Sequence, residues 1–272
     1  GIDFLSLHCL PSNDLFLEQL SDLQAYYSLM AQPDSWERVF IPDILRIAAK
    51  ARSTQTTGNK LPMRIAITEW GVLGPRERNR PVVENYGEVP YAGIFLNMVM
   101  RNCEQVPISN ATALLHGGCI RKASGQVFFD PQYLVIQKYT KLAGANVIHC
   151  SVESPTYDVD RAPDLGLPLK NIPLIDVTCC HKPDTGEFTV CIVNRLLDQC
   201  LPVQVLPETD QDISRVAWEY ITHPDLTSRA RLGEPEQFAI QTDVPIIRQG
   251  VIDVTLPPCS VNWISYFITH IR

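Results

Sequence analysis

The pattern of apolar residues changes once along the chain, near Gly144, and this change limits the possible folds more than any other feature. Before it, compact apolar runs alternate with longer segments in which apolar residues recur at helical spacing. Such alternation predicts parallel strands joined by helical crossovers. After it, short runs of alternating apolar and polar residues are separated by proline, glycine and aspartate, which is typical of an antiparallel sandwich. We therefore expect one unit over residues 1–145 and another over residues 146–272.

The first unit is expected to follow the order strand, helix, strand, helix, strand, helix. Pro33 is expected to break its first helical segment, and Asp34 or Ser35 to cap the helix that follows. Gly144 is expected to end the last helix. The expected strands cover residues 2–8, 64–68 and 106–111, and the expected helices cover residues 15–30, 35–51, 91–102 and 131–142.

The second unit shows no helical period of comparable strength. Its turn signals are frequent, and its strands are therefore expected to be short and antiparallel. The clearest expected strands cover residues 172–180, 187–193, 201–206, 216–221, 238–242 and 261–268.

Charge and composition exclude several classes of function. The 272 residues carry a formal net charge of −7, which repels nucleic acid. No apolar run is long enough to cross a membrane. The scattered glycines form neither a phosphate-binding loop nor a dinucleotide pattern, and no GxSxG motif occurs. The chain does not open with a basic segment followed by an apolar one, so we expect a cytoplasmic protein, with secretion as the alternative.

The nine cysteines do not form a recognisable metal site. None belongs to a CxxC pair, and the spacing of zinc ligands is absent. Adjacent Cys179 and Cys180 would point to opposite faces of a strand. We expect reduced thiols, or some disulfides if the protein is secreted. Four cysteines in apolar surroundings are expected to be small core residues: Cys103, Cys119, Cys191 and Cys259.

Glu69 is the strongest candidate for a chemical role. It directly follows an apolar strand, in Thr68-Glu69-Trp70-Gly71. In a parallel α/β barrel such a residue points into the catalytic mouth, where a carboxylate can attack an anomeric carbon or accept a proton. Trp70 beside it can offer an apolar ring face to a sugar. The tetrapeptide alone fits equally well a carboxylate that caps a strand or forms a salt bridge.

Three further polar groups lie near the ends of expected elements. His8 ends the first strand and can donate to a carboxylate or a sugar hydroxyl, although alone it fits a half-buried structural histidine better. Gln126 offers the donors and acceptors that suit a sugar diol, although alone it fits a solvated loop. The segment His116-Gly117-Gly118 permits close backbone approach, yet such pairs are more often simple loops.

The order of these motifs resembles one known family. Ser6-Leu7-His8, then Thr68-Glu69-Trp70, then residues 97–115, then residues 126–131 resemble the end of the catalytic domain of glycoside hydrolase family 51, which is mostly α-L-arabinofuranosidases. Residues 256–261 resemble the last strands of its C-terminal β-sandwich. The resemblance covers essentially the whole chain.

The resemblance implies a partial (β/α) TIM-type barrel, about its last three β/α units, followed by an antiparallel β-sandwich. Glu69 would be the nucleophile on the seventh barrel strand, His8 would border the same pocket from the sixth, and Gln126 would contact the bound arabinofuranose. The implied function is a retaining hydrolase that releases arabinofuranosyl residues from plant polysaccharides or oligosaccharides. It implies no metal and no organic cofactor.

Three positions depart from the family pattern. Gly71 stands where the family usually has Asn, and Leu73 where a second Trp often follows. The family's sugar-contacting tyrosine is replaced by Leu10, or by Cys9 in another alignment. These changes leave the substrate open, and a glycosidase acting on a glucan or xyloside is an alternative.

The family's acid/base residue is missing. It lies in an Asn-Glu pair on the fourth barrel strand, and this chain contains no Asn-Glu pair. A retaining glycosidase needs two carboxylates about 5–5.5 Å apart, and Glu84 or Glu88 is an improbable substitute. The chain is thus expected to be a fragment, to complete its barrel with a second chain or its own copies, or to be a non-catalytic carbohydrate-binding or assembly module. Open strand edges favour association, so we expect oligomers.

Overall fold

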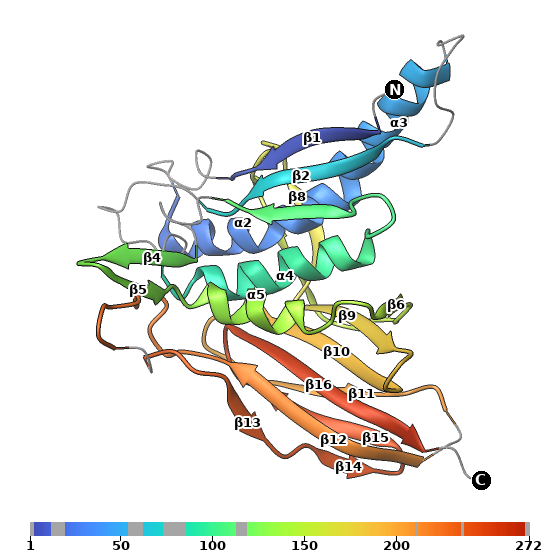
Figure 1. Ribbon diagram of the computed structural model, residues 1–272, viewed down its shortest axis with the longest axis vertical. Helices are drawn as coiled ribbons and strands as arrows, with labels where there is room; N and C mark the ends of the chain where they lie inside the picture. The colour runs from blue at the N-terminus through green and yellow to red at the C-terminus, as the bar shows by residue number, and fades with distance from the viewer. Residues whose placement is uncertain are drawn as a thin grey trace.

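The molecule consists of three layers: a small parallel sheet, a layer of helices and a β-sandwich (Figure 1). The computed structural model describes residues 3–11, 20–53, 62–72, 85–112, 119–209, 212–234 and 237–269. Among these residues, no helix is both long and apolar enough to cross a membrane. No group of three or more His, Cys, Asp or Glu side chains in this part of the chain is placed to hold a metal ion.

The small sheet contains three parallel strands in the order β1-β2-β3. Helices α2 and α3 connect β1 to β2, and α4 connects β2 to β3, as the alternation of apolar segments predicts. The elements of this unit are β1 (Phe4–Cys9), α2 (Asp22–Ser35), the π-helical turn η1 (Trp36–Phe40), α3 (Ile41–Ser53), β2 (Arg64–Trp70), α4 (Glu88–Arg101), β3 (Ile108–Ala111), β4 (Ile120–Ala123), β5 (Gln126–Phe129) and α5 (Gln132–Thr140).

Pro33 does not break the helical segment, contrary to the prediction. It lies inside α2, and the chain continues through η1 into α3. Proline removes one helical hydrogen bond and crowds the preceding turn. The wider π-helical turn follows at once, with the Ile41 N–H donating to the Trp36 carbonyl. Ser35 caps nothing, because its hydroxyl donates to the Gln32 carbonyl at 2.7 Å.

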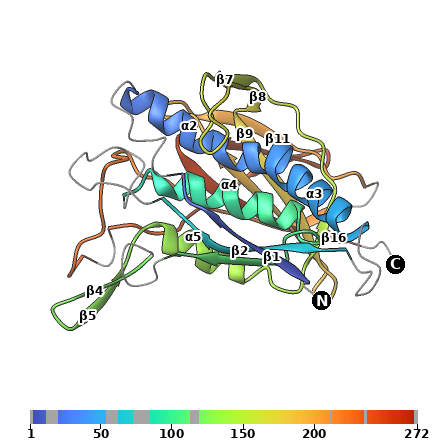
Figure 2. The same ribbon diagram turned by 90° about the horizontal axis from the view of Figure 1, so that it is seen from above.

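The segment that holds Gln126 is a strand, where a loop was expected. β4 and β5 form a hairpin that projects from the body of the molecule (Figure 2). Its turn residues, Ser124 and Gly125, have φ angles of 50° and 76°. Two consecutive residues with positive φ are typical of a type I′ turn, which matches the twist of a two-residue hairpin.

The β-sandwich pairs a six-stranded sheet, β13-β12-β16-β10-β9-β6, with a three-stranded sheet, β11-β15-β14. Apolar side chains from both sheets form one core, including Ile192 and Ile264 from the first and Ile252 and Val254 from the second. The strands of these two sheets are β6 (Asn146–Ile148), β9 (Ile175–Lys182), β10 (Glu187–Asn194), β11 (Leu201–Val205), β12 (Asp212–Ile221), β13 (Gln241–Asp243), β14 (Ile246–Arg248), β15 (Val251–Leu256) and β16 (Ser260–Thr269). Two further strands, β7 (Thr156–Val159) and β8 (Leu169–Pro173), pair with each other in a separate two-stranded sheet.

Several strand predictions for the sandwich need correction. The expected run over 172–180 is two strands, because the chain leaves β8 at Leu174 and then enters β9. β15 was not expected, although it is central to its sheet. Cys119, Cys191 and Cys259 are buried as predicted, but Cys103 is exposed because it lies in the turn after α4. All nine cysteines are free thiols.

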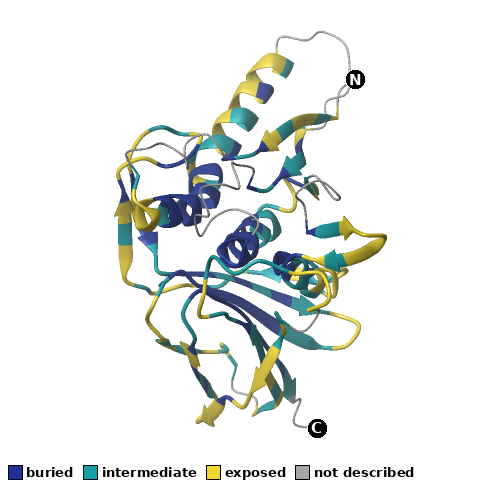
Figure 3. Cartoon of the chain, turned by 90° about the vertical axis from the view of Figure 1, so that its left-hand side faces the viewer, coloured by how far each residue is buried: buried dark blue, intermediate teal, exposed yellow. Residues whose placement is uncertain are grey.

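Helix α4 joins the two units. It packs against β9, β10 and β16, and most of its residues are buried (Figure 3). At Gly93 a Cβ atom would lie 2.8 Å from a methyl carbon of Val193 and 2.9 Å from one of Val261. Glycine is therefore required for this close approach of helix to sheet. One hydrophobic core contains residues from both sides of the chain's change in pattern.

A buried network of charges also joins the helices to the sandwich. Arg195 is fully buried and lies 2.8 Å from an oxygen of Asp34 in α2 and 3.2 Å from one of Asp176 in β9. Arg101 of α4 contacts Asp176 at 3.1 Å and Glu37 at 2.7 Å. Burial opposes ionisation of Asp176, but the two arginines hold its pKa below the ordinary value. Burial raises the pKa of Asp34, despite Arg195.

Candidate active site

The carboxyl ends of the three parallel strands bring His8 and Glu69 together. Parallel strands end at the same edge of a sheet, where polar side chains can converge. His8 Nδ1 lies 3.7 Å from Glu69 Oε2, and the two side chains are 54% and 42% exposed. Both groups are thus open to solvent and adjacent, as their positions at strand ends predict.

A β-bulge at Thr68 sets this juxtaposition. Leu7 pairs with Ile67, but the next residue of β1, His8, pairs with Glu69, so β2 contains one extra residue. The register of β2 against β3 shifts in the same place, between Ile67 and Trp70. Bulges bend a strand and redirect side chains, and they are frequent beside active sites. Here the bulge places Glu69 directly opposite His8.

Thr112 is a further residue of the site that the sequence interpretation missed. Its hydroxyl donates to Glu69 Oε2 at 3.1 Å. Thr112 is the first residue after β3, so the strand-end reasoning that selected His8 and Glu69 could have selected it as well. His116-Gly117-Gly118, the candidate named in this region, lies outside the described residues.

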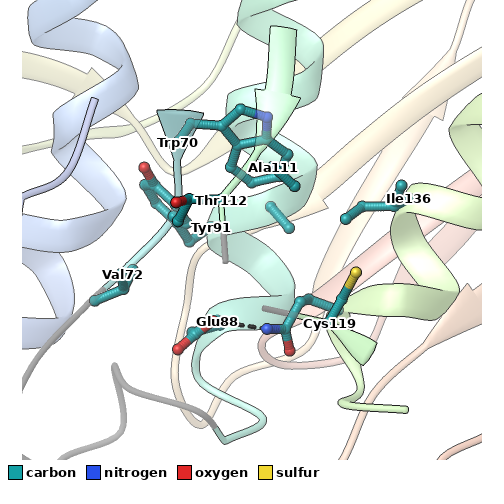
Figure 4. Close-up of a pocket in the computed structure, with 11 residues that line it drawn as sticks. Trp70, Val72, Glu88, Tyr91, Ala111, Thr112, Cys119 and Ile136 are labelled. Carbon is teal, nitrogen blue, oxygen red and sulfur yellow. Dashed lines mark hydrogen bonds between the residues drawn. The ribbon is translucent and has the colours of Figure 1, made fainter. Parts of the chain in front are cut away.

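Trp70 lies in the core and is only 4% exposed. Its ring stacks on Phe95 of α4, with centroids 4.5 Å apart and planes 18° from parallel. That ring face is therefore covered by protein, not presented to a sugar. Trp70 and Thr112 border a cavity of about 20 Å³ (Figure 4), which has room for about one water molecule and none for a sugar.

Gly71 has a backbone conformation that explains one departure from the family pattern. Its φ of +145° lies in a backbone region that residues with a side chain rarely adopt, and a Cβ atom here would lie 3.2 Å from the Thr112 methyl group. An asparagine here would strain the backbone beside Glu69. The glycine is thus required by local geometry next to the candidate nucleophile.

Gln126 lies on the β4–β5 hairpin, and its described contacts include neither His8 nor Glu69. It begins β5, is exposed, and borders a second cavity of about 260 Å³ between the hairpin and residues 230–234. Within the described chain, no recorded contact joins Gln126 to His8 or Glu69. The structure therefore brings together two of the predicted site residues, places Trp70 behind them in the core, and leaves Gln126 on the hairpin.

The site contains one exposed carboxylate, that of Glu69. In the described part of the chain, the recorded side-chain partners of Glu69 are His8 and Thr112, and neither is an acid. Glu88 is buried in the first turn of α4 and accepts a hydrogen bond from Gln132 at 2.9 Å. Glu84 lies outside the described residues. The arrangement can attack an electrophilic carbon, but its described residues do not supply a paired acid.

Comparisons with solved structures show the fold. The α-L-arabinofuranosidase from Thermotoga maritima, in a complex with arabinose, matches with a TM-score of 0.72 and 21% identity over 97% of this chain and 52% of its own. AbfB, a family 51 enzyme from Bifidobacterium longum, matches with a TM-score of 0.76 and 16% identity over 98% and 53%.

A more distant fold match is an enzyme with a different activity. CelM2, a bifunctional glucanase–xylanase from a metagenome library, matches with a TM-score of 0.59 and 14% identity over 98% of this chain and 44% of its own. No curated protein sequence matches the chain. The chain spans about half the length of the arabinofuranosidases.

The sequence also matches one protein family. Residues 69–260, more than half of the chain, match the α-L-arabinofuranosidase C-terminal domain. The match begins at Glu69 and ends at Ser260, the first residue of β16. The chain therefore belongs to the α-L-arabinofuranosidase C-terminal domain family, and its fold is that of the C-terminal portion of family 51 arabinofuranosidases.

Proposed function

We propose that this chain supplies the nucleophile of a retaining glycoside hydrolase that releases arabinofuranosyl residues from plant polysaccharides or oligosaccharides. Glu69 attacks the anomeric carbon and forms a glycosyl-enzyme, which water then hydrolyses. The observation that carries this proposal is the position of Glu69: at the end of a parallel strand, on a bulge, opposite His8 and hydrogen-bonded to Thr112.

The contacts of Glu69 support the role of nucleophile. A half-exposed carboxylate can reach a ligand, and the Thr112 hydroxyl holds one of its oxygens in place. His8 lies where it can donate a hydrogen bond to the carboxylate or to a sugar hydroxyl. Gln126 is proposed as a further sugar contact. This role requires the ligand or the hairpin to bridge the separation between Gln126 and Glu69.

The acid/base carboxylate is proposed to come from polypeptide beyond this sequence. The three parallel strands would then be the last strands of a (β/α) barrel over residues 1–145, with the sandwich over residues 146–272. A complementing chain or further copies of this chain would cover the open sheet. Solution scattering at several concentrations tests association, and a strictly monomeric particle would contradict it.

An aryl arabinofuranoside with a good leaving group tests the nucleophile without the missing acid. Such a leaving group departs without protonation, so attack by Glu69 alone can proceed. We expect a rapid burst of about one equivalent of phenolate per chain, followed by slow turnover. Peptide mass spectrometry should locate the trapped sugar on Glu69.

Two variants make this test specific. Glu69→Gln keeps the size of the side chain but removes its nucleophilic charge, and it should show no burst. Glu208→Gln, which changes an exposed carboxylate in the sandwich unit, serves as the matched control and should react like the wild type. A burst of equal size in Glu69→Gln would contradict the assignment of Glu69 as the nucleophile.

A non-catalytic carbohydrate-binding or assembly module is the second candidate. The observation that favours it is the absence of a second acid among the recorded partners of Glu69 in the described chain. A wild-type protein that binds arabinose-containing oligosaccharides but gives no burst would establish this alternative. Calorimetric titration measures such binding directly.

Chemistry on another glycoside is the third candidate, because CelM2 shares the fold. The departures at Leu10, Gly71 and Leu73 leave the shape of the sugar pocket open. A panel of aryl glucosides, xylosides and arabinofuranosides separates the substrates. The proposal predicts the largest burst with the arabinofuranoside.

A further inference from the structure

The cavity of about 260 Å³ lies between the β4–β5 hairpin and the connection from β12 to β13, residues 222–240. Its walls therefore come from both units of the chain. Figure 1 and Figure 2 both show the hairpin and the orange connection at the end of the molecule toward which β1 and β2 point. The cavity thus lies at the same end of the molecule as the candidate active site.

The connection from β12 to β13 is longer than joining two strands of one sheet requires. Its described residues contain no helix or strand, and loops longer than about 12–15 residues in compact domains are usually functional. The connection is held against the first unit, because the Tyr86 N–H donates to the Ser228 carbonyl and the Gly87 N–H to the Leu226 carbonyl, both at 2.9 Å. These hydrogen bonds carry sandwich residues to the start of α4.

Most of the residues that line the cavity are apolar. They include two hairpin residues, one residue of α5 and one of the connection: Phe128, Phe129, Leu134 and Phe238. The ring of Phe129 stacks on Tyr133, with centroids 4.2 Å apart and planes 15° from parallel, yet Phe129 remains exposed. An aromatic wall is therefore held in place while staying accessible to a ligand.

The charged groups that line the cavity have partners of opposite charge. Asp130 Oδ2 lies 2.5 Å from Arg121 Nε, and Glu234 Oε1 lies 3.7 Å from Arg231 Nη1. The second pair is exposed, so its remaining donors and acceptors, with the Gln126 carboxamide, can bond to hydroxyl groups. This balance of charges favours an uncharged ligand that carries hydroxyls over an anion or a cation.

We propose that this cavity binds one ring of a neutral glycan. A sugar ring has a face of C–H groups and a rim of hydroxyls, which match an aromatic wall beside paired polar groups. The volume of about 260 Å³ is slightly below the range of about 300–1,000 Å³ that is typical of drug-sized ligands. It therefore suits a single ring better than a longer segment.

Within the proposed function, the bound ring lies on the leaving-group side of the bond that Glu69 cleaves. This placement rests on the proposed function, whereas the binding of the ring does not. The sandwich would then take part in recognising the substrate, through residues 230–234 and Phe238. An extended glycan would also bridge the separation between Gln126 and Glu69.

Methyl NMR spectroscopy of the full chain locates the ring. The chain carries Glu69→Gln, which removes the nucleophile, and the probes are the neutral oligosaccharides arabinotetraose and xylotetraose. We expect the methyl resonances of Leu134 and Leu232, which line the cavity, to shift with at least one probe. Those of Leu206, an exposed leucine of the sandwich unit, should stay unchanged. This measurement needs no substitution in the cavity.

Two further substitutions, each in the Glu69→Gln chain, test the cavity by calorimetric titration. Ala230→Phe fills the cavity, and the dissociation constant should rise at least tenfold. Phe129→Ala removes part of the aromatic wall, and the constant should rise about threefold to tenfold. Leu206→Ala, the matched control, should leave it unchanged.

Three results would overturn the proposal: no shift at Leu134 and Leu232 with either probe, a dissociation constant that neither cavity variant changes, or loss of self-association alone in Ala230→Phe. The last result would assign the cavity to a second copy of the chain. The arabinofuranoside burst separates this proposal from the proposed function. A burst without shifts at the two leucines would refute the cavity alone, whereas shifts without a burst would refute the nucleophile and keep the glycan site.

Discussion

The sandwich and the small parallel sheet differ in how completely their strands are covered. Six of the eight residues of β10 are buried, whereas none of the four residues of β3 is. β1 has a single buried residue, Cys9. Leu5 and Ile108, in the two outer strands of the parallel sheet, are 37% and 38% exposed.

This difference follows from how each kind of sheet is usually covered. Antiparallel sandwiches cover their inner faces with each other, as the shared core of the two sheets shows here. Parallel sheets are almost always covered on both faces. The small sheet is therefore less completely covered than the sandwich, and the candidate site residues His8 and Glu69 lie at its edge.

Removing the buried arginine should have the largest effect on the link between the two regions. Arg195→Met leaves Asp34 and Asp176 buried with less compensation, and we expect a loss of about 3–5 kcal/mol in the free energy of unfolding. Urea denaturation monitored by tryptophan fluorescence measures it. Arg231→Met, whose side chain is 71% exposed, should change stability by less than about 0.5 kcal/mol. Equal losses in the two variants would show that the network does not hold the regions together.

Filling the contact between α4 and the sandwich should have the next largest effect. Gly93→Ala places a methyl group against Val193 and Val261, and we expect a net destabilisation of about 1–3 kcal/mol despite the better helix propensity of alanine. Adding Val261→Ala makes room, so the double variant should lose less than the sum of the single losses. Strict additivity in the denaturation data would contradict direct packing.

The same glycine substitution can be compared in the two regions. The two substitutions are Gly71→Asn and Gly186→Asn. At Gly71, beside Glu69, φ is +145° and a Cβ atom would contact the Thr112 methyl group, whereas at Gly186, in the turn between β9 and β10, φ is 74° and the surrounding space is open. Asparagine tolerates the second conformation but not the first. We expect a loss of about 1–2 kcal/mol at Gly71 and less than about 0.5 kcal/mol at Gly186. A thermal melt of both variants gives the comparison, and a larger loss at Gly186 would reverse it.

Thr112→Val should have the smallest effect on stability and a clear effect on reactivity. The change keeps the shape but removes the hydrogen bond to Glu69, so the unfolding free energy should move by less than about 0.5 kcal/mol. The burst with the activated arabinofuranoside should become slower, and Thr112→Ser should restore it. An unchanged burst rate in Thr112→Val would remove the positioning role of Thr112.

The sequence was sufficient to predict the order of strands and helices around the parallel sheet, because that order depends on local apolar patterns. The expectation that His8 and Glu69 border one pocket came from the family resemblance, and the rule that parallel strands end at one edge explains why the two residues meet. The sequence was not sufficient to predict that the helical segment continues past Pro33, because the π-helical turn that accommodates this proline depends on the surrounding packing. The burial of Arg195 likewise depends on contacts between distant segments, whereas the exposure of Cys103 follows from its place in the turn after α4. The β4–β5 hairpin carried a readable signal, Ser124-Gly125, that was overlooked.

The extra residue at Thr68 has a consequence for how related chains should be aligned. Because the bulge determines which side chain of β2 stands opposite His8, the length of that strand carries chemical information that residue identity does not. If β1 and β2 paired without this bulge, Thr68 would stand opposite His8 and the Glu69 carboxylate would turn toward the opposite face. Two related chains could therefore share the Glu-Trp dipeptide and yet differ in whether the glutamate can reach a ligand.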